Sequence, residues 1–189
     1  FDGPDNIAVN LVELTDDDPS SKVGQMKIYT QKNGRTPTGL TPVVTSAHTT
    51  RDIDLDVVFH RKVLQNELLI DEVLSSEEQN EFLQLPRNAK TAVKFMQGNH
   101  MFGKIALSQP LNYECHDMVP DGIAPNIGYI SQAFEVHDLG FSEKAISDLG
   151  CEIYNQRRLV DFPGLGQIEI ITVRAPGSGA LQLIFQLKG

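Results

Sequence analysis

The chain has 189 residues, of which 40% are hydrophobic and 22% are charged, and this size and composition suit a globular domain with its own core. Lys and Arg number 16 against 25 Asp and Glu, giving a formal net charge of −9. This sign argues against a nucleic-acid-binding domain, which normally presents a basic face. No apolar run approaches the roughly 20 residues of a membrane span. We therefore expect one domain over residues 1–189, with no membrane span and no direct nucleic-acid binding.

The start of the chain and its cysteines bear on its origin. The first residue is Phe1 and not Met, which suggests a chain processed or excised from a longer one. Cys115 and Cys151 could form one bridge, but a domain of this length does not need it, so we expect neither cysteine to be required for folding. Few cysteines and no Asn-x-Ser/Thr sequence favour a reducing compartment, or a prokaryotic or viral source.

The first 50 residues predict short strands separated by turns. Residues 7–14 are apolar on both parities, typical of a strand buried on both faces, and residues 25–31 predict a second strand. An acidic loop at residues 15–21 lies between them. Asn33 and Gly34 form a common hairpin turn sequence, and residues 43–46 predict a further short strand.

The most regular hydrophobic pattern lies in residues 51–64. Ile53, Leu55, Val57, Phe59 and Val63 share one parity, whereas the other parity is mostly polar. Successive side chains of a strand point to opposite faces, so the pattern predicts a long central strand with one apolar face. Replacing Leu55 with Ala is then expected to cost about 2–5 kcal/mol, the usual range for a core leucine.

The rest of the chain predicts strands with two short helices between them. Ser75 or Ser76 is suited to cap a helix that ends before Pro86, and Ser142 to cap one that ends at Gly150. Residues 67–74 predict a strand or the approach to a helix. Further strands are predicted at residues 91–96, 104–108, 128–136, 152–162, 167–174 and 180–187.

The number and spacing of the strands indicate an all-β fold. No alternating βαβ units and no internal repeat are evident. We expect an antiparallel β-sandwich, jelly-roll-like, because that topology tolerates helices and long loops between strands. An immunoglobulin-type sandwich fits less well because the chain has no Trp.

Two acidic groups are candidates for binding Ca²⁺, one in a predicted loop and one on a predicted strand. They are Asp16, Asp17 and Asp18, and Asp52, Asp54 and Asp56. The second group begins like an EF-hand loop, but Val57 stands in place of its Gly and Val63 in place of its Glu. On a strand its carboxylates would stand about 7 Å apart, too far to share one ion. The alternative for the loop group is an ordinary acidic surface loop. The alternative for the strand group is a solvated or salt-bridged face with Lys94 and Arg157 as partners, and no other cofactor is indicated.

No motif specifies a catalytic site. Cys115, His116 and Asp117 adjoin in sequence, but neighbours on an extended chain point apart, so they are not a pre-formed triad. Cys115 with His137 and Asp138 is a conceivable nucleophile set, and burial of Cys115 in the core is the alternative. No zinc-like His pair, phosphate loop or Gly-x-Ser-x-Gly motif is present. A glycosidase carboxylate pair stays open, but the aromatic platform of a sugar cleft is poorly supplied by four Tyr and no Trp.

The longest irregular stretch, residues 110–126, is the expected contact region. Long loops between strands often make functional contacts. Four apolar side chains in or beside it would form an interaction patch if exposed together, whereas packing back onto the sandwich would make the loop a lid. They are Met118, Val119, Ile123 and Ile127.

These features favour a non-catalytic structural or assembly subunit of a particle, capsid-like shell or filament. It would act through protein–protein contacts in a homo- or hetero-oligomer. A secreted or surface binding module for a glycan or protein, with or without Ca²⁺, is the alternative, and a hydrolase on the same scaffold is a third. A virion, another assembled particle or the extracellular surface is the expected location.

Overall fold

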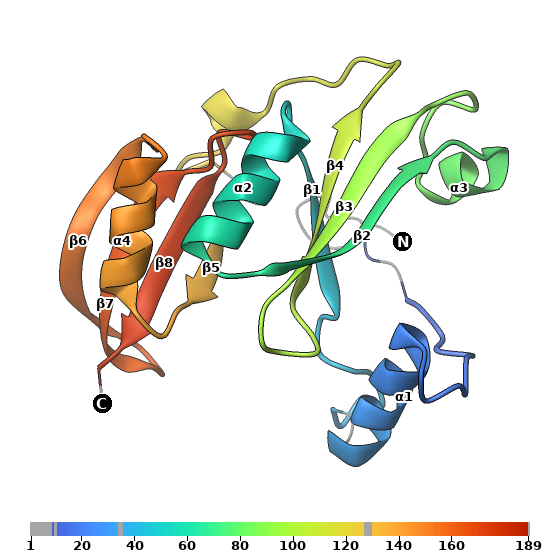
Figure 1. The fold of residues 1–189 in the computed structure, drawn as a ribbon, viewed down its shortest axis with the longest axis horizontal. Helices are drawn as coiled ribbons and strands as arrows, with labels where there is room; N and C mark the ends of the chain where they lie inside the picture. Colours follow the sequence, from blue (N-terminus) through green and yellow to red (C-terminus); the bar gives the residue numbers. More distant parts are fainter. Residues whose placement is uncertain (1–8, 10, 34–35, 127–129, 189) are drawn as a thin grey trace.

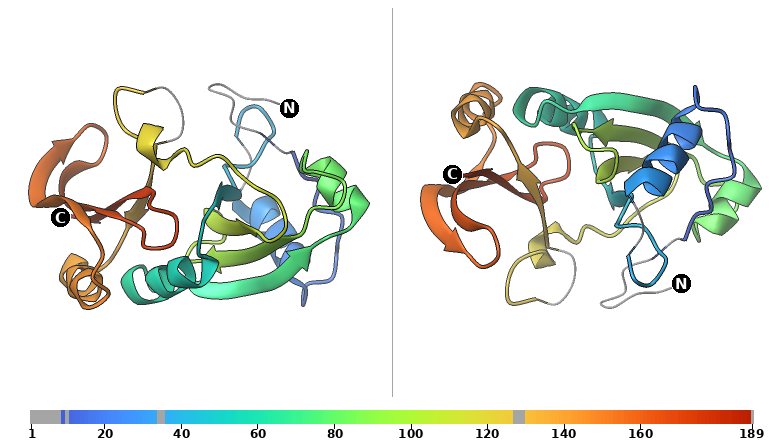
Figure 2. Two further views of the ribbon diagram at one scale, coloured as in Figure 1. Left: turned by 90° about the horizontal axis from the view of Figure 1, so that it is seen from above. Right: turned by 90° about the horizontal axis from the view of Figure 1, so that it is seen from below.

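The computed structural model describes residues 9, 11–33, 36–126 and 130–188. Two four-stranded sheets lie side by side, and helices α2 and α4 run next to each other along one side of them (Figures 1 and 2). A search of these residues for a helix long and apolar enough to cross a membrane finds none.

The two sheets are built by two βαβββ units that follow one another along the chain. The first unit consists of β1 (Thr45–Thr49), α2 (Ile53–Val63), β2 (Glu67–Leu74), β3 (Thr91–Gln97) and β4 (Lys104–Pro110). The second consists of β5 (Ser131–Glu135), α4 (Leu139–Asp148), β6 (Ile153–Phe162), β7 (Gly166–Arg174) and β8 (Leu181–Leu187). The sheet orders are β1-β4-β3-β2 and β5-β8-β7-β6. In each sheet the first strand runs parallel to the fourth, and the remaining neighbours are antiparallel.

This topology contradicts the predicted antiparallel jelly-roll sandwich. Each unit contains a parallel strand pair joined through a helix, which a purely antiparallel fold does not have. The repeat of the βαβββ order also went unnoticed in the sequence, because the two units share topology without an evident sequence repeat. The strands predicted after residue 66 are nevertheless close to the observed ones.

The central strand predicted at residues 51–64 is wrong, because this segment forms α2. Asp52 is the N-cap, and its side chain accepts hydrogen bonds from the backbone N–H groups of Asp54 and Leu55. Acidic residues in the first turn and basic residues in the last suit the helix dipole. The buried positions follow helical spacing: they are Ile53, Asp56, Val57, Phe59, His60 and Val63. Leu55, predicted to be core, is 47% exposed.

Helix α2 contributes to two separate clusters of the core. Ile53 and Val57 near its start pack with Leu107 and other residues of the first sheet. Phe59 and Val63 near its end pack with residues of α4, β7 and β8 in the second unit. In Figure 1 the helix is seen between the two sheets, and Figure 2 shows it with α4 on one side of them. The helix therefore joins the two halves of the molecule.

The other helices differ in how well the sequence predicted them. Residues 25–31 were predicted as a strand but lie in α1 (Lys22–Asn33), where Tyr29 packs edge-on against Phe102 with ring centroids 5.2 Å apart. Helix α3 (Glu77–Phe82) begins with the expected capping box, formed by Ser76 and Gln79. Helix α4 is capped by Asp138 and not by Ser142, whose buried hydroxyl donates to the Val63 carbonyl at 2.7 Å.

Candidate functional site

A cavity of about 640 Å³ lies between the two sheets, at the end of the molecule where β1 and β4 finish and β8 begins. Its walls combine both βαβββ units with the long connection between them. The lining residues are 48–51, 109–110, 115–119, 122, 130–132, 174 and 178–182. Cavities of this size accommodate small organic molecules.

Two buried glutamines from the second sheet form one wall of this cavity. Gln132 on β5 is directly opposite Gln182 on the parallel strand β8, so both side chains are on the same face. Gln132 is 6% exposed and Gln182 is completely buried. The Oε1 of Gln132 and both amide atoms of Gln182 have no hydrogen-bond partner within the protein. The Nε2 of Gln132 lies 3.5 Å from the Ser46 hydroxyl of β1, which links the two sheets.

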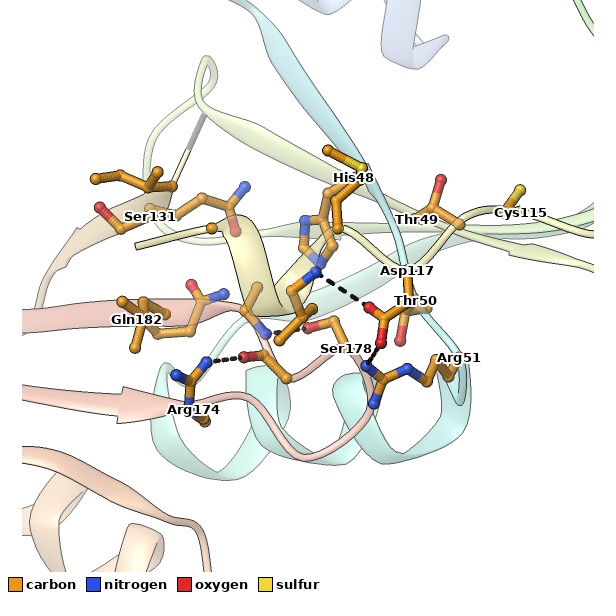
Figure 3. A pocket seen from close by; sticks show the side chains of 18 of the residues that line it. His48, Thr49, Thr50, Arg51, Cys115, Asp117, Ser131, Arg174, Ser178 and Gln182 are labelled. Atoms are coloured by element: carbon orange, nitrogen blue, oxygen red, sulfur yellow. Dashed lines mark hydrogen bonds and ion pairs between the residues drawn. The ribbon is translucent and has the colours of Figure 1, made fainter. Parts of the chain in front are cut away.

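His48 on β1 supplies the third buried polar group. Neither of its ring nitrogens has a hydrogen-bond partner in the protein. Its Nε2 lies 3.9 Å from Oδ2 of Asp56, beyond hydrogen-bonding distance but within the range of charge attraction. Figure 3 shows His48 between Gln182 and Ser131 on one side and Asp117 on the other.

The carboxylate of Asp56 is held beneath His48 by backbone donors. Its Oδ1 accepts hydrogen bonds from the N–H groups of Gly177 at 2.8 Å and Ser178 at 3.3 Å. Burial acts to raise the pKa of Asp56, but the interactions with His48, Thr50 and the Gly177 N–H outweigh it, so the pKa lies below its ordinary value. Asp56 is therefore a buried anion beside the imidazole.

The outer part of the cavity carries charged side chains that are already paired. Arg51 and Asp117 form an ion pair at 2.5 Å. Arg174 contacts Glu152 at 3.5 Å and donates to the Gly179 carbonyl at 2.9 Å. Apolar residues, among them Met118, Val119 and Leu181, also line the cavity.

The structure does not assemble the predicted Ca²⁺ groups. In the described ranges, no three His, Cys, Asp or Glu side chains are grouped so that they could hold a metal ion. Asp16 and Asp18 bind the hydroxyls of Ser21 and Ser20, and Asp17 pairs with Lys27 at 2.7 Å. Binding of Ca²⁺ is therefore not confirmed.

The second acidic group is dispersed because it lies on a helix. Asp52 caps α2, Asp54 forms an ion pair with Lys94 at 2.7 Å, and Asp56 points toward the β7–β8 turn. The expected partner Lys94 is thus correct, whereas Arg157 pairs with Glu143 and Glu169 instead. The inner wall offers the imidazole of His48 and the two neutral amides of Gln132 and Gln182, which is a poor donor set for a transition metal.

The long connection brings two of the four predicted contact residues to the cavity. Met118 is 61% exposed, and both it and the half-buried Val119 line the cavity. Ile123 is half-buried beside them, and Ile127 lies outside the described residues. Cys115 lines the cavity and is exposed, so its predicted burial is wrong; Cys115 and Cys151 are both free. Asp138, which was considered with Cys115 and His137 as part of a nucleophile set, is the N-cap of α4.

Sequence reasoning did not single out the residues that form the inner wall. Gln182 sits at a polar position of an alternating strand, where glutamine normally faces solvent, and Gln132 is a lone polar residue on the parity of Ile130 and Phe134. Only the parallel pairing of β5 with β8 brings them together. No other histidine lies at a sequence spacing from His48 that is typical of a metal site.

Solved structures share this fold at low sequence identity. A glyoxalase family protein from Bacillus cereus aligns with a TM-score of 0.66 and 16% identity, over 82% of this chain and 100% of that chain. A glyoxalase I mutant from Zea mays aligns with a TM-score of 0.54 and 14% identity, over 78% of this chain and 46% of that one. A protein from the mobile metagenome of V. Pseudocholerae gives a TM-score of 0.51 and 19% identity, over 79% and 97% of the two chains. No protein-family model and no curated protein matches the sequence.

These similarities show a glyoxalase-type βαβββ fold. They contradict the prediction of an assembly subunit for a capsid-like particle, because that prediction was based on a jelly-roll sandwich, whereas the structures that share this chain's fold include glyoxalase-family proteins. The alternatives, a glycan- or protein-binding module and a hydrolase, were based on a β-sandwich that the chain does not form.

Proposed function

We propose that the protein binds a small organic molecule in the cavity between its two sheets. The observation that carries the proposal is the set of buried polar side chains in the cavity wall, Gln132, Gln182 and His48, which lack hydrogen-bond partners within the protein. A buried polar group without a partner costs about 1–3 kcal/mol. Such groups in a cavity wall are commonly kept for recognition of a ligand.

The composition of the cavity agrees with this proposal. Apolar side chains such as Met118 and Leu181 give a ligand surface to bury, and the few polar groups converge at the inner wall. This combination is typical of small-molecule sites.

Ligand-observed NMR with a diverse library of small organic compounds tests the proposal. Binders of the wild-type protein should be lost in Val119→Trp, because a bulky ring at this lining position fills the cavity. Val73→Trp is the matched control, since Val73 is 55% exposed on β2 and is not a lining residue. If no compound binds the wild type, or if binding survives in a folded Val119→Trp variant, the cavity is not a ligand site.

Proton transfer on the bound molecule is a second candidate, favoured by the pairing of His48 with the buried Asp56 at 3.9 Å. In this role His48 accepts a proton from the ligand, and the nearby carboxylate stabilises the imidazolium. A ligand from the library would be incubated in D₂O, and deuterium exchange at its acidic C–H positions followed by NMR. Exchange that is as fast with His48→Gln as with the wild type excludes this role.

A further inference from the structure

We infer that the ligand is uncharged and presents a carboxamide-like edge, an N–H beside a C=O, to Gln182 and Gln132. Compounds of this class include primary amides, lactams, imides and ureas. The inference rests on the proposed function and specifies the chemistry of the molecule that the cavity takes.

The first argument is the set of hydrogen-bonding atoms that the protein leaves free. Gln182 has both a free Nε2 donor and a free Oε1 acceptor, and Gln132 adds a free Oε1 acceptor. Turning either amide by half a turn exchanges its oxygen and nitrogen, so the wall keeps both kinds of group in either orientation. A ligand that satisfies this set must itself donate and accept from neighbouring atoms.

The second argument is geometric. Gln132 and Gln182 are paired residues on adjacent parallel strands, which lie about 4.8 Å apart. The planar N–H/C=O edge of a ligand can therefore form two hydrogen bonds with Gln182. The rest of the same polar group then lies within reach of Gln132. Bidentate pairing of this kind is how glutamine and asparagine recognise the donor–acceptor edge of adenine.

The third argument is that the Arg and Asp side chains of the cavity lining are not free to neutralise an ionic ligand. The Arg and Asp side chains in the described lining already have ionic partners: Arg51 with Asp117, and Arg174 with Glu152. Burying a carboxylate or an ammonium group against two neutral amides would leave its charge uncompensated. The inner wall therefore favours a neutral polar group over either charged one.

Both amides are sealed from bulk water in this conformation. A ligand reaches them by displacing neighbouring side chains. Once it is bound, its polar edge is fully desolvated. A buried site built to hydrogen-bond discriminates strongly against an analogue that lacks the matching groups, because its own polar atoms then stay unpaired.

Four compounds with one ring system separate these possibilities: 2-naphthamide, 2-naphthoate, 2-naphthylmethylamine and 2-methylnaphthalene. Their dissociation constants are measured by NMR titration against the wild type and Gln182→Leu. Gln167→Leu is the matched control, since Gln167 is exposed on β7 and lies outside the cavity. The wild type and the control should bind 2-naphthamide at least about tenfold more tightly than the other three, a difference of about 1.4 kcal/mol.

Gln182→Leu should lose this preference and melt at or above the wild-type temperature, because leucine replaces an unpaired buried amide with an apolar group of similar size. If Gln182→Leu does not fold, Gln132→Leu provides the same comparison. Preference for the carboxylate or the amine, or an amide preference that survives in the folded leucine variants, overturns the inference. If none of the four compounds binds but library compounds occupy the cavity, the ligand class is wrong and the proposed function stands. If no library compound binds either, both are wrong.

Discussion

The carboxylate of Asp56 in α2 accepts a hydrogen bond from the backbone N–H of Gly177, 2.8 Å away in the turn between β7 and β8. This contact joins the helix of the first βαβββ unit to a turn of the second. The approach is so close that a Cβ on residue 177 would lie 2.0 Å from the Asp52 carbonyl oxygen and 2.7 Å from Cγ of Asp56. The two units thus meet backbone to backbone at this point.

Replacing Gly177 with Ala should therefore lower the free energy of unfolding by about 2–3 kcal/mol or more, because the added methyl group must push the turn away from α2. Urea unfolding measures the change. Gly122→Ala is a suitable control, because the nearest atom to its added Cβ is 3.5 Å away. This substitution should therefore change the free energy of unfolding little. Equal stability of the two variants would show that the turn does not pack against α2 in this way.

A pair of valines in α2 tests which face of the helix is buried. Val63 is completely buried, whereas Val58 is 37% exposed. Val63→Ala should cost about 2–3 kcal/mol through lost burial and the cavity left behind. Val58→Ala should cost about 0.5 kcal/mol or less, as most surface changes do. Chemical denaturation of both variants checks the difference, and a larger loss at Val58 would mean that the helix is rotated.

The misreading of α2 shows what the sequence could and could not predict. Ile53, Leu55, Val57 and Phe59 alternate like a strand, but the same segment holds an N-cap aspartate and charges ordered along the helix dipole. Over so few residues, the hydrophobic periods of a strand, 2 residues, and of a helix, about 3.6 residues, cannot be told apart. The β6, β7 and β8 strands were predicted well because each is long, alternating and bounded by turns. The parallel pairing of β5 with β8 could not be assigned, since pairing across about fifty residues leaves no local signal.

His60 gives stability an acid-sensitive component. Burial lowers the pKa of His60 to about 4; the electrostatic interaction with His48 acts in the same direction, and the interaction with Asp56 acts against it. The folded protein therefore holds His60 neutral at a pH where the unfolded chain, with its ordinary pKa of about 6.5, is protonated. The contribution of neutral His60 to the free energy of unfolding is therefore fully present above pH 6.5. It falls by about 1.4 kcal/mol per pH unit between pH 6.5 and 4.

Equilibrium unfolding at several pH values checks this component. His60→Gln cannot take up the proton, so its stability should vary less across the window, by up to about 3 kcal/mol. The pKa of Asp56 is lowered from its ordinary value of 3.8, so the protonation of Asp56 changes stability only below that pH, outside this window. Parallel pH profiles for the wild type and His60→Gln would contradict the assignment.

The two thiols should differ in reactivity. Cys115 is exposed at the cavity, whereas Cys151 is half-buried and its pKa is raised by burial and by the charge of Asp56. The thiolate is the reactive form, so Ellman's reagent should titrate Cys115 rapidly and Cys151 slowly. Cys115→Ser should remove the fast phase and Cys151→Ser the slow one. Reductant should leave the melting temperature unchanged, because the thiols are free; a marked drop would reveal a disulfide.

The inner wall of the cavity depended on spatial proximity that the sequence does not record. Residues 110–126 were predicted to make functional contacts, and part of this connection does line the cavity. Gln132, Gln182 and His48 were not chosen, because each is unremarkable until three strands from different parts of the chain converge. Met118 and Val119 stay predictions as contact residues, now at a cavity and not on an open patch.

The shared role of α2 limits how the cavity can open. Swinging the two sheets apart about a hinge would withdraw Phe59 and Val63 from the cluster formed with α4, β7 and β8, exposing side chains that are completely buried. Each would cost about 1.5–3 kcal/mol in lost burial alone. The segment at residues 115–118 lines the cavity and is exposed, so its displacement carries no such penalty. Entry and exit of a small molecule are therefore expected to pass by this segment, with the two sheets fixed as a single frame.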